Sequence, residues 1–451
     1  MLRTSPHSRS LPEPVRALLK KLQGEGVGAV LARGVAGGFS VNILGALIGL
    51  VAQAVLARLM GGEQYGIYAY VFTWLSVLSL AAKLGFDTTL LRYVAAYKAK
   101  QQWSLLRGLL IRTNQMVVVL SIATGVVTAI VVELLSDRLS SDLVRTFWVL
   151  CLILPLSSLC SLRSAALRAL RKVVLARLPD EVLRPTLLAC LAAGCYFVFS
   201  IEVNALLAMV LQSVALLAAF FIGAYWMRLA MPDEVFQSAP EYENREWIRY
   251  AVPLVLFSAM NVILQRIDTL MLGAFLDTTS AGYYSVAVRI AKLMAFGLAA
   301  VNMIAAPMIS SLYAQENMEE LQRMLRLSAL GIMAYTIPVT AGMILFGNYL
   351  LLIFGEEFVA AYPALVILAL GQMINALAGS SGYVMTMTGH QNIALKIMSI
   401  SAVVNILLNW LLIPRYGMNG AAWATALSLV GWNVAFVVYA RRKIGLRTTV
   451  L

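Results

Sequence analysis

Long apolar stretches separated by short polar segments make up most of this chain. Twelve of them, some completed by flanking residues, are long enough to cross a bilayer. Roughly 20 helical residues, each rising 1.5 Å, cover a hydrocarbon core about 30 Å thick. Most of the stretches carry no charged residue, as in 35–57, 203–227 and 416–440. The pattern therefore predicts an all-α polytopic membrane protein with about twelve transmembrane helices.

The last six stretches repeat the first six at one fixed offset along the chain. Gly66 matches Gly282 in an early helix of each half, and Ala224 matches Ala440 at the same offset in the last helix. One register held along both halves indicates a duplicated six-helix unit, which is typical of transporters. Because six is an even number, both units enter the membrane with the same polarity. We therefore expect two six-helix lobes related by a pseudo-two-fold axis along the membrane normal.

Composition and charge agree with a membrane protein and disfavour a soluble one. Charged residues make up 13% of the chain, against about 25% in a typical soluble domain. The formal net charge is +13, yet the basic residues gather on one set of loops. The opposite loops hold Arg58, Arg138, Arg145 and Arg415. This bias predicts that both termini face the cytoplasm, and it explains the basic charge without a nucleic-acid partner.

Polar segments divide the chain into its predicted parts. The stretch between the lobes contains Pro232, Pro240 and several acids, a composition typical of an exposed linker. The N-terminal segment is expected to be either an amphipathic helix on the inner membrane surface or disordered chain. The predicted organisation is a cytoplasmic N-terminal segment (1–34), a first lobe (35–229), a cytoplasmic linker (230–248), a second lobe (249–440) and a basic cytoplasmic tail (441–451).

Residue patterns typical of catalysis or metal binding are missing from the sequence. The histidines are His7 and His390, and no Cys/His cluster has metal-ligand spacing. The four cysteines fall inside predicted spans, where they fit as small, reduced apolar residues. No phosphate-binding glycine loop or nucleophile elbow stands in a suitable context. We therefore expect no enzyme, no metal and no cofactor.

Basic residues deep inside predicted spans are the main candidates for function. Arg266, Arg289 and Lys292 fall about 12–17 Å below the outer surface at 1.5 Å per residue. A cation at the bilayer centre costs about 2.5–3.5 kcal/mol, so these three favour a water-filled cavity or an anionic ligand. Lys83 needs no such explanation, because it lies near a span end, four residues before Asp87, with which it is expected to pair.

Polar uncharged residues and one acid lie in the same spans. Asn261, Gln265 and Asp268 form a stripe on one helix, and Gln372 and Asn375 share a face of a later helix. Such amides either line a cavity or form hydrogen bonds between packed helices. Asp268 is the one acid well inside a span. It is therefore a candidate for ion coupling, unless it balances the neighbouring arginine.

Several motifs follow one another along the chain in a characteristic order and spacing. They include Gly61-Gly-Glu-Gln-Tyr-Gly-Ile-Tyr68, Leu84-Gly-Phe-Asp87, Gln265-Arg-Ile-Asp-Thr-Leu-Met-Leu-Gly273, Met387-Thr-Gly-His390 and Leu412-Ile-Pro-Arg-Tyr-Gly417. Together they resemble the polysaccharide and O-antigen flippases of the multidrug/oligosaccharidyl-lipid/polysaccharide (MOP) exporter superfamily, and the resemblance covers essentially all of residues 35–440. The glycine pair at 61 and 62 suits a tight turn on the outer side.

The resemblance implies a flippase that carries an undecaprenyl-pyrophosphate-linked oligosaccharide from the cytoplasmic to the outer leaflet by alternating access, coupled to an ion. It implies a monomer in the bacterial cytoplasmic (inner) membrane, working beside a polymerase and other glycan-assembly proteins in O-antigen (lipopolysaccharide), capsule or exopolysaccharide synthesis. The cationic residues would hold the pyrophosphate, and the amides would meet sugar. The assigned substrate residues are Arg266, Arg289, Lys292, Asn261, Gln265, Gln372 and Asn375, with Asp268 as the ion-coupling candidate.

Two other functions stay open. A multidrug/cation antiporter of the same superfamily would favour embedded carboxylates that face cationic drugs, yet the first predicted helix, 35–57, contains none. A non-transporting scaffold of a glycan-assembly complex is a more distant alternative. The net positive charge deep in the second lobe favours the flippase, because it matches a diphosphate.

Overall fold

Helices make up nearly all of the chain that the structure, a computed structural model, describes. It describes residues 27–449, and for residues 27–36, 253, 256, 257 and 261 it describes the backbone alone. No strand occurs within 27–449, so the all-α class is confirmed. Most of the predicted N-terminal segment (1–34) lies outside the described residues.

Within residues 27–449, the first half of the chain forms seven α-helices and the second half the remainder. The first half contains α2 (Val27–Lys83), α3 (Phe86–Ala99), α4 (Trp103–Leu134), α5 (Ser141–Ala169), α6 (Val173–Leu178), the π-turn η3 (Pro179–Leu183), α7 (Arg184–Phe197) and α8 (Ala205–Ala230). A short α9 (Asp233–Gln237) follows. The second half contains α10 (Asn244–Phe275), α11 (Thr278–Ala291), the 3₁₀ turn η4 (Lys292–Met294), α12 (Ala295–Ala314), α13 (Met318–Leu352), the 3₁₀ turn η5 (Glu356–Ala361), α14 (Tyr362–Leu377), α15 (Ser381–Met387) and α16 (Gln391–Tyr439).

The long helices accommodate the twelve predicted crossings. Within the described residues, eight helices are long and apolar enough to span a membrane, and the segments 37–83 and 391–444 have the length of two crossings each. Each is interrupted by a glycine with positive φ, Gly61 at 72° and Gly417 at 57°, a conformation that glycine adopts without steric cost. Gly61 belongs to the predicted outer turn. Counting α6–η3–α7, α10 and α11–η4–α12 as one crossing each gives six crossings per half, which is consistent with the predicted twelve.

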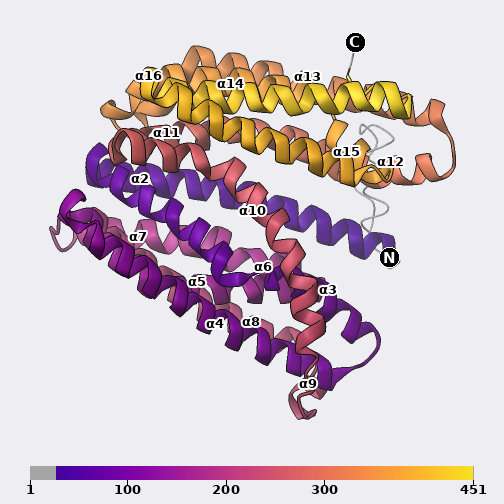
Figure 1. Cartoon of the computed structure of the whole chain (residues 1–451), viewed down its shortest axis with the longest axis horizontal. Coiled ribbons are helices and arrows are strands. Elements are labelled where there is room, and N and C mark those ends of the chain that lie inside the picture. Colours follow the sequence, from indigo (N-terminus) through magenta and orange to yellow (C-terminus); the bar gives the residue numbers. More distant parts are fainter. Residues whose placement is uncertain (1–26, 450–451) are drawn as a thin grey trace, which may run out of the picture.

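The helices of each half group together, and the two groups meet where α2 packs along α11 (Figure 1). Gly66 and Gly282, which hold equivalent positions in the two halves, face each other at this junction. A Cβ on Gly282 would lie 2.6 Å from Cα of Gly66. Two equivalent positions contact each other directly where a two-fold axis passes between them. The contact is consistent with the predicted pseudo-two-fold relation.

Further contacts join the lobes on the side predicted to face outward. Glu357 of η5 accepts a hydrogen bond of 2.6 Å from the backbone N–H of Gly62. Arg58 donates to the carbonyl oxygens of Leu352 and Ile353, at 3.0 and 2.7 Å, at the end of α13. The Phe358 ring, 1% exposed, packs edge-on against Tyr65. We call these contacts, with Gly66 and Gly282, the outer junction, and they hold the two lobes together on that side.

The linker is exposed along most of its length, as predicted, but its end is anchored to the first lobe. Trp247 is 1% exposed and donates from Nε1 to the Tyr97 hydroxyl at 3.0 Å. Tyr97 in turn donates to Glu243 at 2.8 Å, and Tyr93 donates to Glu246 at 2.8 Å. The inner end of α10 is therefore fixed to α3 of the first lobe.

Candidate functional site

A cavity of about 680 Å³ lies between the lobes, at about the middle of the long helices. Its walls come from α2, which contributes Gly45–Leu50, and from α10, α11, α14 and α16. The volume falls within the range of roughly 300–1,000 Å³ that is typical of ligand sites. The crossing formed by α11 and α12, which carries Arg289 and Lys292, is interrupted here by the 3₁₀ turn η4, which begins at Lys292. The Lys292 side chain is exposed in this cavity although it lies deep within the helix bundle.

The three cations that the sequence singles out converge at this place. Arg289 and Lys292 line the cavity, and together with Arg266 they line a smaller adjoining space of about 190 Å³. Within residues 27–449, the ion pairs are those of Lys83, Arg163 and Arg177, so no acid pairs with these three cations. Nε of Arg289 is buried without a hydrogen-bond partner. Asp268 is the one acid among the residues that line these two spaces, so the three cations outnumber it and leave a net positive charge that can bind an anion.

The first lobe supplies the opposite wall of the smaller space. Gln53, Tyr68 and Thr73 of α2 face the three cations there. Gln53 accepts a hydrogen bond of 3.0 Å from Tyr65, and Tyr68 donates to Gln212 at 3.4 Å. Neutral polar groups therefore meet the cations from the first lobe, and the site spans both lobes.

The predicted amides fall into three groups in the structure. Gln265 is exposed and lines both spaces. Gln372 and Asn375 line the larger cavity and are also hydrogen-bonded to each other, since Asn375 Nδ2 donates to Gln372 Oε1 at 3.3 Å. The side chain of Asn261 lies outside the described residues. Asn375 also accepts a hydrogen bond of 2.8 Å from Asn433 of α16, so cavity lining and hydrogen bonding between helices both hold for Asn375, whereas the bond of Gln372 lies within α14.

Asp268 is held by neutral donors and is not paired with Arg266. Its side chain is 5% exposed, at the edge of the central cavity. Asn409 Nδ2 donates to Oδ1 at 2.7 Å, Tyr284 donates to Oδ2 at 3.2 Å, and the Thr425 hydroxyl also donates to Oδ2. We call this set the Asp268 cage. Tyr284, Asn409 and Thr425 were not predicted from the sequence, although Asn409 forms a polar stripe with Asn405, four residues earlier in the same span.

Two further expectations concern ion pairs and metals. The predicted pair of Lys83 with Asp87 is confirmed, with 3.5 Å between Nζ and Oδ2. Among the residues that the structure describes, no group of three or more His, Cys, Asp or Glu side chains is arranged to hold a metal ion. The polar groups at the site are thus cations, amides, hydroxyls and one caged carboxylate.

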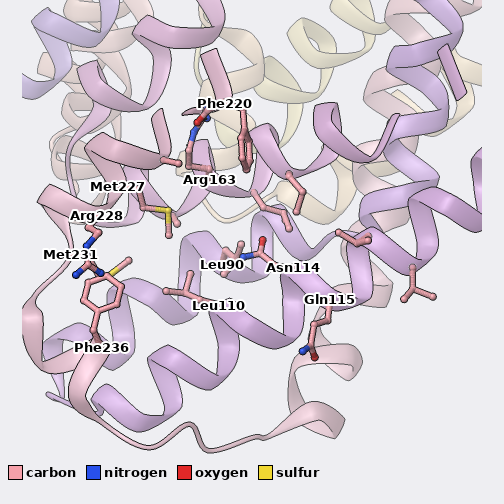
Figure 2. Close-up of a pocket in the computed structure, with 16 residues that line it drawn as sticks. Leu90, Leu110, Asn114, Gln115, Arg163, Phe220, Met227, Arg228, Met231 and Phe236 are labelled. Carbon is pink, nitrogen blue, oxygen red and sulfur yellow. The ribbon is translucent and has the colours of Figure 1, made fainter. Parts of the chain in front are cut away.

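A second cavity, of about 640 Å³, lies within the first lobe and lacks these features. It runs between α4, α5 and α8, and most of its lining side chains are apolar, such as Leu90 and Leu110. Its two arginines are engaged by the protein. Arg228 lies 4.3 Å from the ring centroid of Phe236 at one end (Figure 2), and Arg163 donates to backbone carbonyls of α8. The central cavity is therefore the candidate site.

Comparisons with known proteins agree with this architecture. The family described as "Polysaccharide biosynthesis protein" matches residues 31–313, and the family described as "Lipid II flippase MurJ" matches residues 185–450. The chain is 27% identical over 191 residues to the "Probable low-salt glycan biosynthesis flippase Agl15" of Haloferax volcanii. That match covers 42% of this chain and 40% of the relative, so it spans less than half the length of that protein.

Solved structures share the fold at low sequence identity. The lipid II flippase MurJ in an inward closed conformation aligns with a TM-score of 0.70 at 14% identity, over 89% of this chain and 87% of that chain. An inward-facing multidrug resistance MATE family transporter of the MOP superfamily aligns with a TM-score of 0.66 at 15% identity, over 91% and 98%. At this identity the likeness establishes the fold and leaves the cargo to the chemistry of the site.

Proposed function

The chain belongs to the polysaccharide biosynthesis protein family of the MOP superfamily, and we propose that it is a flippase for an undecaprenyl-pyrophosphate-linked oligosaccharide. The carrying observation is the convergence of Arg266, Arg289 and Lys292 on one cavity without a paired acid. A diphosphate offers several anionic oxygens at one point, and Arg and Lys bind such oxygens through charge-assisted hydrogen bonds. The cluster is suited to a ligand of that charge.

The same observation disfavours the alternative of a multidrug/cation antiporter. A cationic drug would enter a cavity that already holds unpaired positive charge, and like charges in a low-dielectric site repel strongly. The one buried acid, Asp268, accepts hydrogen bonds from three neutral donors and presents little free surface. A lipid-linked peptidoglycan precursor, the cargo in the name of the MurJ family, also carries a pyrophosphate and falls within the proposed class.

Transport would proceed by alternating access around the fixed cavity. The outer junction closes the cavity on one side, so the ligand would load from the cytoplasmic leaflet. The head group would bind in the cavity, and the polyprenyl tail would remain in the bilayer. Opening the outer junction would then release the glycan outward. We place the protein in the bacterial cytoplasmic membrane with both termini inside, as the distribution of basic residues predicts.

Asp268 is the proposed coupling residue. A buried carboxylate changes its charge when it binds a proton or a monovalent cation, and the cage would rearrange in response. Oδ1 of Asn409 is buried without a hydrogen-bond partner and offers a further oxygen next to the carboxylate. The cage also joins α10, α11 and α16, three helices of the second lobe. Ion binding there would alter how these helices pack beside the cavity.

A leaflet-resolved assay tests the proposal. The full chain would be reconstituted into proteoliposomes with a fluorescent undecaprenyl-pyrophosphate-linked oligosaccharide, and appearance of the glycan in the opposite leaflet would be followed by an impermeant quencher. We expect transport by the wild type and none by empty liposomes. Equal rates in both, with correctly inserted protein, would refute the flippase. Transport of cationic dyes instead would favour the antiporter.

A further inference from the structure

Beside its cations, the central cavity has a wall of hydroxyl and aromatic side chains to which the proposed function assigns no ligand contact. Thr425, Ser428 and Trp432 of α16 line the cavity at positions i, i+3 and i+7 and so share one face of the helix. The indole of Trp432 is partly buried. It packs on one side against the cluster of Met385, Ala394 and Phe436. The ring is therefore held in place by apolar neighbours while part of it remains available to the cavity.

A chain of amides ends at the wall of the cavity that this indole also lines. Asn433 Nδ2 donates to the backbone carbonyl of Leu429 and to Asn375 Oδ1, both at 2.8 Å. Asn375 Nδ2 then donates to Gln372 Oε1 at 3.3 Å. The Leu429 carbonyl can only accept, so it fixes the N–H₂ group of Asn433 as a donor and with it the direction of the two hydrogen bonds that follow. In the described part of the chain, the N–H₂ group of Gln372 donates to no residue, and it remains free at the cavity wall.

An aromatic face next to directed amide donors is suited to a sugar ring. One face of a pyranose is made of C–H groups and packs on an aromatic ring, while its edge carries hydroxyls that need hydrogen-bond partners. Lys292, 14 residues into its crossing from Thr278, and Trp432, 15 residues beyond Gly417, lie at similar depth, about 21–23 Å from those outer ends. Both residues also line the same cavity, so one ligand in that cavity can contact both.

The geometry points to a sugar subsite formed by Trp432 and Gln372, which binds the pyranose attached directly to the pyrophosphate. Resting on the proposed function, this inference assigns the cations to the diphosphate and the α14–α16 wall to the first sugar. Asn375 and Asn433 are positioning residues, since they act by orienting Gln372. The cavity of about 680 Å³ has room for both groups. Selection of a glycosylated lipid over the bare lipid pyrophosphate would thus reside in the second lobe.

The test compares two ligands that differ by one sugar. Binding of farnesyl pyrophosphate would be measured with the detergent-solubilised full chain. It would then be measured for the same lipid pyrophosphate carrying one glucose, galactose or N-acetylglucosamine. We expect at least one sugar to raise wild-type affinity about tenfold over the bare lipid pyrophosphate. Trp432→Leu should remove that gain and leave affinity for the bare ligand within twofold, whereas Trp432→Phe should retain most of it.

Controls separate the subsite from the fold and from the proposed function. Trp410→Leu changes an exposed tryptophan (63%) of the same helix that does not line the cavity, and it should keep the gain. Gln372→Ala should lower the gain about fivefold, and Arg289→Ala should weaken both ligands equally. A full gain in Trp432→Leu, or no gain with any sugar in the wild type, would overturn the subsite alone. No binding of any lipid pyrophosphate by the wild type would overturn the proposed function, and the subsite with it.

Discussion

The two lobes share one helical plan but differ in the chemistry they bring to the centre. The second lobe contributes three cations and a caged acid to the central site. The first lobe contributes neutral groups of α2. In the register that pairs Gly66 with Gly282, the first-lobe equivalents of Arg266, Asp268, Arg289 and Lys292 are Leu50, Ala52, Thr73 and Ser76. The two lobes therefore share one helical scaffold, but these charged residues of the site occur in the second lobe.

Two equivalent tyrosines, one in each lobe, illustrate this difference in chemistry between the lobes. Tyr68 and Tyr284 are matched by the same register, and both are fully buried and bonded to the last helix of their own lobe. Tyr68 donates to the neutral amide of Gln212, whereas Tyr284 contacts Thr425 and donates to the carboxylate of Asp268. One tyrosine joins helices, and the other also holds an ionisable group. We infer that the first lobe serves mainly as a frame and the second lobe binds and couples.

The largest effect should come from the cations. Arg289→Ala or Lys292→Ala should each lower the transport rate about 100-fold with normal membrane levels, because a charge-assisted bond to phosphate contributes about 1.5–3 kcal/mol. Transport would be measured in the leaflet-resolved assay.

Ser76→Ala, at the position in the first lobe equivalent to Lys292, is the matched control. Its hydroxyl donates to the Phe72 carbonyl of its own helix, so we expect a change of less than twofold. An equal loss of transport in Ser76→Ala and in the cation variants would show that the two lobes do not differ in their contribution. Wild-type rates in both cation variants would refute the diphosphate site.

A smaller effect is expected from the equivalent tyrosines. Tyr284→Phe removes one of the three donors to Asp268 and should lower gradient-driven transport about fivefold, whereas Tyr68→Phe should change it less than twofold.

Asp268→Asn should lower the transport rate about tenfold and abolish its dependence on the driving ion, because an amide cannot change charge. Initial rates would be compared under imposed proton and sodium gradients. If Asp268→Asn kept the normal rate and ion dependence, coupling would reside elsewhere.

More of the fold than of the candidate site could be predicted from the sequence, and the reason is physical. Helix length, the fixed register between the halves and the turn at Gly61 depend on local composition and spacing. The Asp268 cage joins groups that are 16 to 157 residues apart, so no single stretch contains it. Trp432 was missed because a tryptophan in an apolar span also fits lipid contact. Arg266, Arg289 and Lys292 could be selected as candidates because a charge at depth is unusual in any span.

A change at the axis tests whether the lobes move against each other as equivalent bodies. A Cβ at residue 66 would lie 2.5 Å from the Thr278 carbonyl oxygen, and one at 282 would meet Gly66. Gly66→Ala or Gly282→Ala should therefore hold the outer junction open and raise the labelling of an outer-side cysteine about threefold with an impermeant maleimide. Gly331→Ala is the control, because a Cβ at residue 331 would have no atom within 4 Å. Its labelling should equal that of the protein with the same outer-side cysteine and no glycine substitution. Unchanged labelling in both axial variants would show that closure tolerates the extra methyl group.

The smallest effect concerns the anchor between the linker and the first lobe. Tyr93→Phe removes the hydrogen bond to Glu246 and should lower the free energy of unfolding by about 1 kcal/mol. Burial and the hydrogen bond to the Glu246 carboxylate raise the pKa of Tyr93 to about 12. Because the raised pKa favours the neutral phenol in the folded protein, the contribution is complete below about pH 10 and declines toward pH 12. Unfolding would be followed by denaturant titration at pH 7 and 9, where Tyr93→Phe should differ from wild type by the same amount. Tyr242→Phe, which keeps its ring near Arg112, is the control, and an equal loss there would show that the anchor contributes nothing specific.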